Sequence, residues 1–298
     1  MNVVITGGSG FVGSHLCQLL VKQGHTVTIV GNTPPKQNAQ GIAFIKANLL
    51  EEEVPPIFAE CEAIIHLAGA PIFHRWTKSY KQLILDSRIK TAQKICLFLS
   101  QQTKRPKVFI SASATGFYGN RGDNLLTETA KPGSDFLSSV CIEWEKAAEK
   151  FSSLGMRVVS VRTSTVLGSD GGALAKMIPL FRWGLGGKLG NGKQWFPWIH
   201  IDDLTRIYAE ALQNPQMTGA INAVAPGKIR NVEFTKTLGN ILKRPTFLPV
   251  PSFALRLCLG AFANALLSSQ RVMPEKLQQM KFPFLYPKIE KALLQISG

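Results

Sequence analysis

The sequence predicts an α/β protein whose centre is a doubly wound sheet of parallel strands. Short apolar runs rich in β-branched residues alternate with longer stretches of helical periodicity, and a glycine-rich turn joins the first run to the first helix. The chain has 298 residues, of which 45 % are hydrophobic and 18 % charged, so it can bury one large core and carry an additional lobe.

The expected strands are short, and most are separated by helices. The first strand covers 2–6, a helix follows over 14–23 and ends at Gly24, and the next strand covers 26–30. Further strands are predicted at 42–45, 63–67, 108–110 and 158–161, and long helices at 78–101 and 135–152. Because helices connect successive strands, the strands are expected to pair in parallel.

The residue composition of the chain changes after Arg162. A glycine-rich stretch covers 168–192, an aromatic segment follows at 194–198, and a helix is expected to begin at Asp202 or Asp203. We predict a cofactor-binding domain over 1–168, with a contribution from about 198–225, and a smaller, mostly helical substrate or cap domain over 169–298 that ends in a helical segment at 249–298. Residues 253–267 are amphipathic, and Arg256 and the flanking prolines favour a core or lid helix over a membrane-surface helix.

Composition limits the partners. The chain has 34 basic and 19 acidic residues, a net charge of +15, but its Lys and Arg residues are mostly single, which favours a solvated basic surface over a nucleic-acid site. Attraction for an anionic substrate is the alternative. No uncharged apolar stretch reaches the roughly 18 residues of a membrane span. Five scattered cysteines and the absence of a signal-peptide pattern lead us to expect a cytoplasmic protein without a metal site.

Three glycines follow the first expected strand with the spacing Gly7-x-x-Gly10-x-x-Gly13. Such glycines let the backbone turn sharply, approach a pyrophosphate and pack the helix on the strand, while the helix N-terminus offers free N–H groups to the anion. The pattern predicts a Rossmann-type dinucleotide site in which Gly7, Gly10, Phe11, Val12 and Gly13 contact the cofactor.

The end of the second strand indicates which dinucleotide binds. A carboxylate there holds the ribose of NAD, whereas a basic side chain accepts the 2′-phosphate of NADP. This chain has Gly31 and Asn32 with no carboxylate, and Lys36 is near enough to reach a phosphate if the turn folds back. The sequence therefore favours NADP over NAD.

Two arginines are expected on inward-facing positions. Arg88 lies on the apolar stripe of the helix 78–101, and Arg162 ends a predicted strand. A buried arginine must be paired, because an unpaired buried charge is costly. Each arginine has two open interpretations, an internal salt bridge or a contact with a cofactor phosphate.

Several sequence blocks resemble the extended short-chain dehydrogenase/reductases. They are TGGSGFVG at 6–13, HLAG at 66–69, SASATGFYG at 111–119 and WIHIDDL at 198–204. The blocks RWT at 75–77, SR at 87–88, WE at 144–145, GGA at 171–173 and GLGG at 184–187 are similar to the YfcH-type epimerase-family proteins, which carry a short C-terminal domain of unknown function. The resemblance covers almost the whole chain.

The resemblance implies an NAD(P)-binding domain followed by a substrate domain. It places the loop Gly7–Gly13, Asn32, the tripeptide Leu67-Ala68-Gly69 and Arg88 at the cofactor, although this branch usually has arginine at the position of Asn32. The superfamily moves protons with a Ser/Thr and a Tyr-x-x-x-Lys pair. None of the four tyrosines here has lysine four residues later, so that pair is absent.

The remaining candidates for chemistry each have a structural alternative. Ser113 follows the expected strand 107–111 and either contacts the substrate or caps a turn. Tyr118 is the candidate acid from another position, although a structural tyrosine is favoured. Cys141 is expected to be a small buried residue and His66 a core histidine. The other open candidates are His200 as a substrate contact and the aromatic segment 195–198 as a substrate wall or a domain junction.

Two functions remain open. The favoured one is an NADP-binding oxidoreductase or epimerase-like enzyme that acts on a small, anionic or nucleotide-sugar-like molecule with a non-standard proton donor. The alternative is a dinucleotide-binding sensor that kept the cofactor site and lost the chemistry. Assembly into an oligomer is compatible with either.

Overall fold

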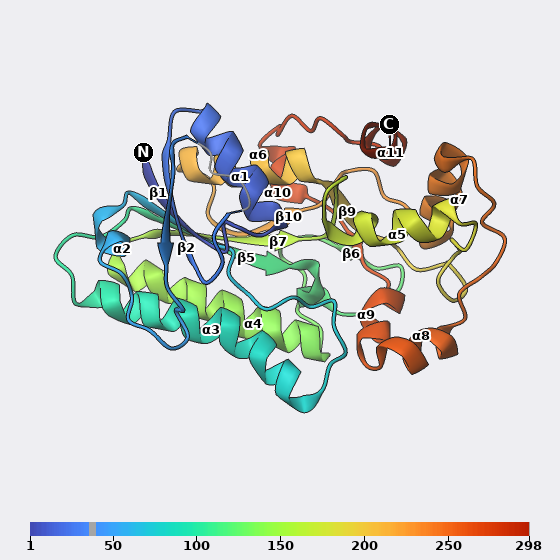
Figure 1. The fold of residues 1–298 in the computed structure, drawn as a ribbon, viewed down its shortest axis with the longest axis horizontal. Helices are drawn as coiled ribbons and strands as arrows, with labels where there is room; N and C mark the ends of the chain where they lie inside the picture. Colours follow the sequence, from blue (N-terminus) through green and yellow to red (C-terminus); the bar gives the residue numbers. More distant parts are fainter. Residues whose placement is uncertain (36–39, 298) are drawn as a thin grey trace.

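The fold is organised around a seven-stranded, fully parallel sheet (Figure 1). The structure is a computed structural model, and it describes residues 1–35 and 40–297. The strands lie in the order β10-β7-β5-β4-β1-β2-β3, with bounds β1 Asn2–Thr6, β2 Thr26–Gly31, β3 Ile42–Lys46, β4 Ala63–His66, β5 Val108–Ala114, β7 Arg157–Thr163 and β10 Gly219–Ala223. The doubly wound arrangement predicted from the sequence is confirmed.

Helices cover both faces of the sheet. On one face lie α2 (Ile57–Glu60), α3 (Lys78–Ser100), α4 (Phe136–Glu149) and the 3₁₀ turn Lys150–Leu154, and on the other α1 (Phe11–Lys22), α6 (Ile201–Gln213) and α10 (Glu275–Gln279) (Figure 1). The strands alternate their buried side chains between these layers: Ile64 packs toward α3, whereas Ile65 packs toward α1 and α6. Because helices bury the side chains on both faces of the sheet, the strands consist of short runs of apolar residues.

A smaller lobe follows the sheet. It contains α5 (Gly172–Arg182), α7 (Asn231–Leu242), α8 (Ser252–Leu259), α9 (Phe262–Leu267) and α11 (Ile289–Ser297), with the paired strands β8 (Thr165–Leu167) and β9 (Trp198–His200) at its root. A second short pair, β6 (Leu125–Leu126) and β11 (Arg271–Val272), ties the lobe back to the loop after β5. The lobe has its own core, in which Trp198 packs with Phe234 and Leu293.

The C-terminal lobe is helical, as predicted, but two elements differ from the expectation. Helix α6 begins at Ile201 instead of at Asp202 or Asp203, because the imidazole of His200 caps it by accepting the N–H of Asp202. The expected helix 253–267 is broken at Gly260, and none of the eight side chains of α8 is buried. Helix α8 is therefore not a core helix. In the part of the chain that the structure describes, every helix is too short or too polar to cross a membrane.

Candidate functional site

The loops after β1 and β4 leave the sheet at the point where the strand order reverses. Parallel α/β sheets bind ligands at this point, beyond the carboxyl ends of the strands. Here the two loops touch: the N–H of Ala68 donates to Thr6 Oγ1 at 3.3 Å, and a Cβ on Gly7 would lie 2.9 Å from the nitrogen of Ala68. Gly7 also has a positive φ of 70°, which favours glycine. The sequence-predicted Gly7, Leu67 and Ala68 are thus brought together.

The start of α1 has the form that an anion site requires. Gly10 is its N-cap, and among the described residues no side chain caps this end and no acidic residue stands in its first turn. The backbone N–H groups of Phe11, Val12 and Gly13 are therefore available to a ligand. A Cβ on Gly13 would lie 2.4 Å from Gly7 O, so only glycine lets the helix pack this closely on the loop.

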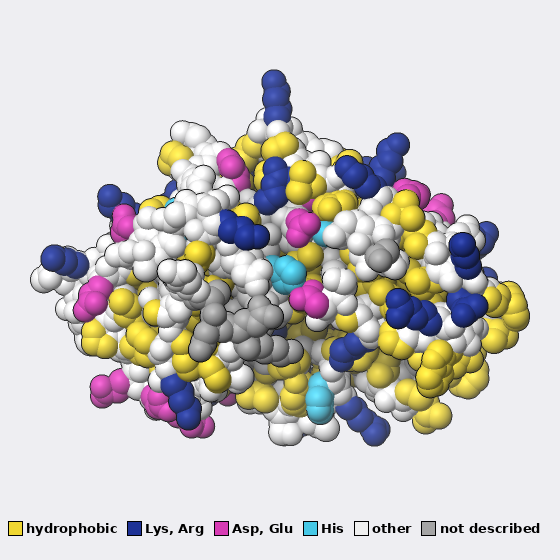
Figure 2. Space-filling model, turned by 45° about the horizontal axis from the view of Figure 1, so that its top comes forward, with side chains coloured by type: hydrophobic (Ala, Val, Ile, Leu, Met, Phe, Trp, Pro, Cys, Tyr) yellow, Lys and Arg dark blue, Asp and Glu magenta, His cyan; other side chains and the backbone are white. Residues whose placement is uncertain are grey.

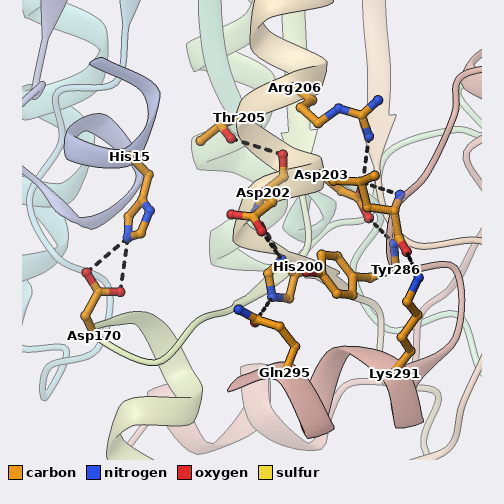
Figure 3. Close-up of polar contacts among 11 residues, drawn as sticks. His15, Asp170, His200, Asp202, Asp203, Thr205, Arg206, Tyr286, Lys291 and Gln295 are labelled. Carbon is orange, nitrogen blue, oxygen red and sulfur yellow. Dashed lines mark hydrogen bonds and ion pairs between the residues drawn. The ribbon is translucent and has the colours of Figure 1, made fainter. Parts of the chain in front are cut away.

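Helix α1 is also fastened to the smaller lobe. The ring of Phe11 lies against Gly168, Gly171 and Gly172, where a Cβ on Gly171 would come within 2.3 Å of the ring. One turn later, His15 Nε2 lies 3.0 Å from both carboxylate oxygens of Asp170 (Figure 3). The side chain of Phe11 thus serves the junction between the lobes, and its backbone N–H is the part that remains for a cofactor.

The specificity position is at the surface. Strand β2 ends at Gly31, and the Asn32 side chain that follows is exposed, beyond the edge of the sheet at which the glycine loop lies. Lys36 lies outside the described residues.

Arg88 does not form the internal salt bridge that was one of its two interpretations. It is buried, and among the described residues no carboxylate lies within salt-bridge distance of it. Its guanidinium donates to the carbonyls of Ile84 at 3.0 Å and Ala70 at 2.9 Å, and it stacks 5.0 Å from the ring of Trp144. Burial lowers the pKa of Arg88 to about 10. Arg88 supports the loop after β4, including Gly69, whose Cβ would lie 2.8 Å from the guanidinium carbon.

Arg162 forms an internal salt bridge, which is one of its two interpretations. Its Nε and Nη2 each donate to one oxygen of Glu145 on α4 at 2.8 Å, and its Nη1 donates to the hydroxyl of Tyr118 at 2.9 Å. Burial by itself would lower the pKa of Arg162, but the hydrogen bonds and charge of Glu145 raise it above its ordinary value. The positive charge of Arg162 is thus paired within the protein.

Ser113 lies at the carboxyl end of β5 and belongs to the same cluster. Its hydroxyl donates to Glu145 Oε1 at 2.6 Å, so its proton is already directed at a carboxylate. The lone pairs of Ser113 Oγ remain able to accept a hydrogen bond. Because this contact joins two side chains, it does not support the alternative in which Ser113 caps a turn.

Tyr118 has the geometry of a structural tyrosine. It is fully buried, its hydroxyl donates to Asn222 Oδ1 at 2.7 Å, and the same oxygen accepts from Arg162. Burial raises the pKa of Tyr118. With its proton held by Asn222, Tyr118 is poorly placed to act as an acid toward a substrate.

The remaining candidates are held inside the protein. His66 is a buried core histidine, with Nδ1 2.7 Å from Thr6 Oγ1, and burial lowers its pKa to about 4. Cys141 is buried, and burial raises the pKa of its thiol to about 12. Trp198 lies in the core of the smaller lobe, and its indole N–H donates to the carbonyl of Gly227.

His200 has both ring nitrogens occupied. Nε2 lies 2.9 Å from Gln295 Oε1, Nδ1 accepts the N–H of Asp202, and the ring stacks 3.8 Å from Tyr286 (Figure 3). The neighbouring Asp203 is fully buried and accepts the backbone N–H groups of Leu285 and Tyr286 at 2.7 and 2.9 Å. These contacts attach the C-terminal segment to α6, and they leave no ring nitrogen of His200 for a substrate.

Glu145 is the member of this polar cluster that the sequence analysis did not place at the site. A signal for it was present, because Glu145 follows Cys141 by four residues and Ser138 by seven on a helix, which puts all three on one face. That face packs against β5 and the turn after it. A carboxylate on an inward helical face needs a cation, and Arg162 is the one that lies there.

Comparisons with known proteins agree with this geometry. Residues 3–224 match the NAD dependent epimerase/dehydratase family, and residues 250–296 match a domain of unknown function (DUF1731). The chain is 39 % identical to the epimerase family protein SDR39U1 homolog, chloroplastic, of Arabidopsis thaliana, over 99 % of this chain and 86 % of the relative. It is 36 % identical to the epimerase family protein YfhF of Bacillus subtilis, over 99 % and 98 %.

Solved structures of epimerases are also similar to this chain. The crystal structure of human epimerase family protein SDR39U1 (isoform 2) with NADPH is similar with a TM-score of 0.89 and 34 % identity, covering 100 % of this chain and 99 % of that one. UDP-glucuronic acid 4-epimerase from Bacillus cereus has a TM-score of 0.82 at 18 % identity, covering 98 % and 96 %, and shows the shared fold alone. The glycine loop at the switch point of the sheet and the match over residues 3–224 together show that this chain belongs to the NAD dependent epimerase/dehydratase family.

Proposed function

We propose that the chain binds NADP(H) and uses it to oxidise or reduce a carbon–oxygen bond of a small molecule. The observation that carries the proposal is the uncapped start of α1 at the switch point, with three backbone N–H groups and no acidic residue in the first turn of the helix. A pyrophosphate fits there because a Cβ on Gly10 would meet only Gly7 O, at 3.3 Å, which leaves the outer side of the loop open. The human relative bound to NADPH supports the choice of dinucleotide.

The residues around the dinucleotide follow from the same placement. Gly7, Gly10, Phe11, Val12 and Gly13 bind the pyrophosphate through their backbone, Gly31 and Asn32 lie at the adenosine ribose, and Leu67, Ala68 and Gly69 flank the middle of the cofactor. Arg88 acts through its hydrogen bonds to the loop after β4 and is a positioning residue. Arg162, paired with Glu145, lies on the substrate side.

Asn32→Asp should reverse the preference between the two dinucleotides. The exchange keeps the shape of the side chain but adds a negative charge facing the 2′-phosphate, and we expect NADPH affinity to fall by about tenfold or more while NADH affinity is kept or improved. Titration of cofactor-free protein, followed by NADPH fluorescence or calorimetry, measures both. Binding of neither dinucleotide by the unmodified chain would overturn the proposed function, and an unchanged ratio in the variant would remove Asn32 from the specificity site.

The chemistry requires a route for a proton that replaces the missing Tyr-x-x-x-Lys pair. When bound, the nicotinamide accepts or supplies the hydride. A substrate hydroxyl that donates to Ser113 Oγ loses its proton to Ser113 as Ser113 passes its own proton to Glu145, 2.6 Å away. Arg162 holds both oxygens of Glu145 in place for this transfer. The reverse direction returns the proton to a carbonyl oxygen by the same path.

Ser113→Ala should remove turnover and leave cofactor binding intact. General acid–base groups contribute about a hundredfold or more to rate, so we expect a loss of that size in NADPH oxidation with any carbonyl compound that the unmodified chain reduces. Ser139→Ala is the matched control, because Ser139 is an exposed serine on α4 whose hydroxyl contacts only the carbonyl of Phe136 within its own helix. Full activity of Ser113→Ala would exclude Ser113 from the proton route.

The absence of Tyr-x-x-x-Lys supports a second candidate function, a dinucleotide-dependent sensor without turnover. In that case the His15–Asp170 and Phe11 contacts between α1 and the smaller lobe would transmit the occupancy of the glycine loop. NADPH binding without oxidation by a broad panel of carbonyl compounds would favour the sensor.

We also propose that the protein works in a reducing compartment such as the cytoplasm. Its five cysteines are all free thiols, and three of them, Cys17, Cys61 and Cys141, are buried. The relatives reported above come from a bacterium, a plant and human, and the plant protein is named as chloroplastic.

A further inference from the structure

One end of the smaller lobe exposes an unusual number of large apolar side chains. We define the apolar face as Leu180, Trp183, Leu185, Phe247, Phe253 and Leu257, whose exposed fractions lie between 52 % and 81 %. Figure 2 shows hydrophobic side chains gathered at the right-hand end of the molecule, over this lobe, with Lys and Arg side chains among them. Contiguous apolar surface of this kind marks an interaction site in soluble proteins.

Two hydrogen bonds, one from a side chain and one from the backbone, bring the segments of this face together. Arg244 Nε donates to the carbonyl of Arg182 at 2.8 Å, and Val250 N donates to the carbonyl of Lys188 at 2.9 Å. The stretch after α5, which carries Trp183 and Leu185, therefore runs beside the stretch that carries Phe247. The members of the face are neighbours in space although about 60 residues separate the two stretches.

Helix α8 follows the stretch that carries Phe247 in the chain. It starts after Pro251 and ends at Leu259, and Phe253 and Leu257, four residues apart, project from the same side. Both side chains are more than 70 % exposed, whereas Leu255 and Leu259 on the opposite side of the helix are half-buried. A helix this exposed needs a neighbouring segment that holds it on the protein. Here α9 packs against α8, and its Phe262 and Ala263 are buried.

The two stretches of the chain that carry the apolar face have charges of a single sign. The stretch 171–201 contains four Lys or Arg residues and no Asp or Glu, and the stretch 234–274 contains five and none. Arg182, Lys243, Arg244 and Arg256 are exposed beside the apolar side chains. A partner for this face must therefore offer both an apolar interior and negative charge. A second copy of the chain would instead bring two basic faces together.

We propose that the apolar face docks onto the surface of a lipid bilayer that contains anionic headgroups. Trp, Phe and Leu side chains interleaved with arginine and lysine are the composition of helices and loops that lie in the membrane interface. The apolar side chains enter the headgroup region, and the basic side chains contact lipid phosphates. This surface is separate from the glycine loop and from Ser113, so the proposal does not depend on the proposed function.

Vesicle flotation of the full chain tests the proposal. Vesicles of phosphatidylcholine alone are compared with vesicles that also contain phosphatidylglycerol, at low and high salt. We expect binding to the anionic vesicles, weaker binding at high salt, and a loss of about tenfold or more in Phe253→Ser/Leu257→Ser, because two side chains leave the interface. Arg182→Gln/Arg256→Gln should weaken binding to anionic vesicles by a similar factor.

Leu97→Ser is the matched control, because Leu97 is 63 % exposed near the C-terminal end of α3, whereas the smaller lobe adjoins the other end of that helix, where Trp76 contacts Phe262. It should bind vesicles as the unmodified chain does. Failure of the unmodified chain to float with anionic vesicles at low salt would overturn the proposal, as would equal binding by Phe253→Ser/Leu257→Ser. Analytical sedimentation tests whether a second copy of the chain occupies the face instead. A dimer that Phe253→Ser/Leu257→Ser dissociates, in the absence of vesicle binding, would show that the face is a protein interface and not a membrane surface.

Discussion

Arg162→Leu is expected to lower the free energy of unfolding by about 3–5 kcal/mol, the range for breaking a buried ion pair on one side. The change leaves the carboxylate of Glu145 half-buried without its cation, and it also removes the donor to Tyr118 Oη and to the carbonyl of Glu128. The cation stacks 3.5 Å from the ring of Phe117, so packing is lost as well. Urea unfolding followed by circular dichroism measures the loss.

An exposed ion pair on the same helix provides the control for Arg162. Lys146 and Glu143 on α4 lie 2.8 Å apart, and both side chains are exposed. Lys146→Ala should change stability by only about 0.5 kcal/mol, because solvent screens exposed pairs. Replacing Glu145 and Arg162 together by leucine should recover part of the loss. A cost for Arg162→Leu no larger than for Lys146→Ala would show that the buried pair does not stabilise the fold.

Gly13→Ala is expected to abolish measurable NADPH binding, with a loss of affinity of about a hundredfold or more. The new methyl group would lie 2.4 Å from Gly7 O and 2.6 Å from Gly8 Cα, both backbone atoms that cannot move away without displacing the loop. The start of α1 would shift, and its N–H groups would no longer converge on the pyrophosphate. Fluorescence titration with NADPH gives the affinity, and circular dichroism reports whether the fold is kept.

Gly24→Ala separates this effect from a general loss of stability. Gly24 follows the other end of α1, has a φ of 81°, and has open space where the methyl group would go. The substitution should cost about 1 kcal/mol of stability through the strained backbone and leave NADPH affinity unchanged. Equal affinities of Gly13→Ala and the unmodified chain would mean that the glycine loop does not hold the cofactor.

The parallel pairing of the strands follows from local sequence signals. Apolar runs separated by helical periods predict parallel pairing, and the structure has seven parallel strands. The glycine spacing located the turn between β1 and α1, because that turn needs glycine at Gly7 and Gly13 for steric reasons that act within a few residues. Element ends were less accurate: α1 begins at Phe11, three residues before the predicted start, because Phe11 and Val12 stand between two glycines, Gly10 and Gly13, and glycine is a poor helix former.

The partners of the buried polar groups could not be read from the sequence. Arg88 and Arg162 both looked like inward-facing cations, yet Arg162 has a carboxylate and Arg88 has carbonyls. Their partners lie on other elements, at distances along the chain that no periodic pattern encodes. Asp203 likewise resembles a helix cap in sequence, whereas it binds two backbone N–H groups more than 80 residues away.

The sequence by itself determined the sheet, the glycine loop and the absence of the usual proton-transfer pair, since these depend on residue type and short spacing. Only the tertiary structure decided that Ser113, Glu145 and Arg162 form one hydrogen-bonded cluster, and that α8 turns Phe253 and Leu257 toward solvent. Amphipathic periodicity shows that a helix has an apolar side. Whether that side meets a core or water depends on the packing of the segments around it, which long-range contacts set.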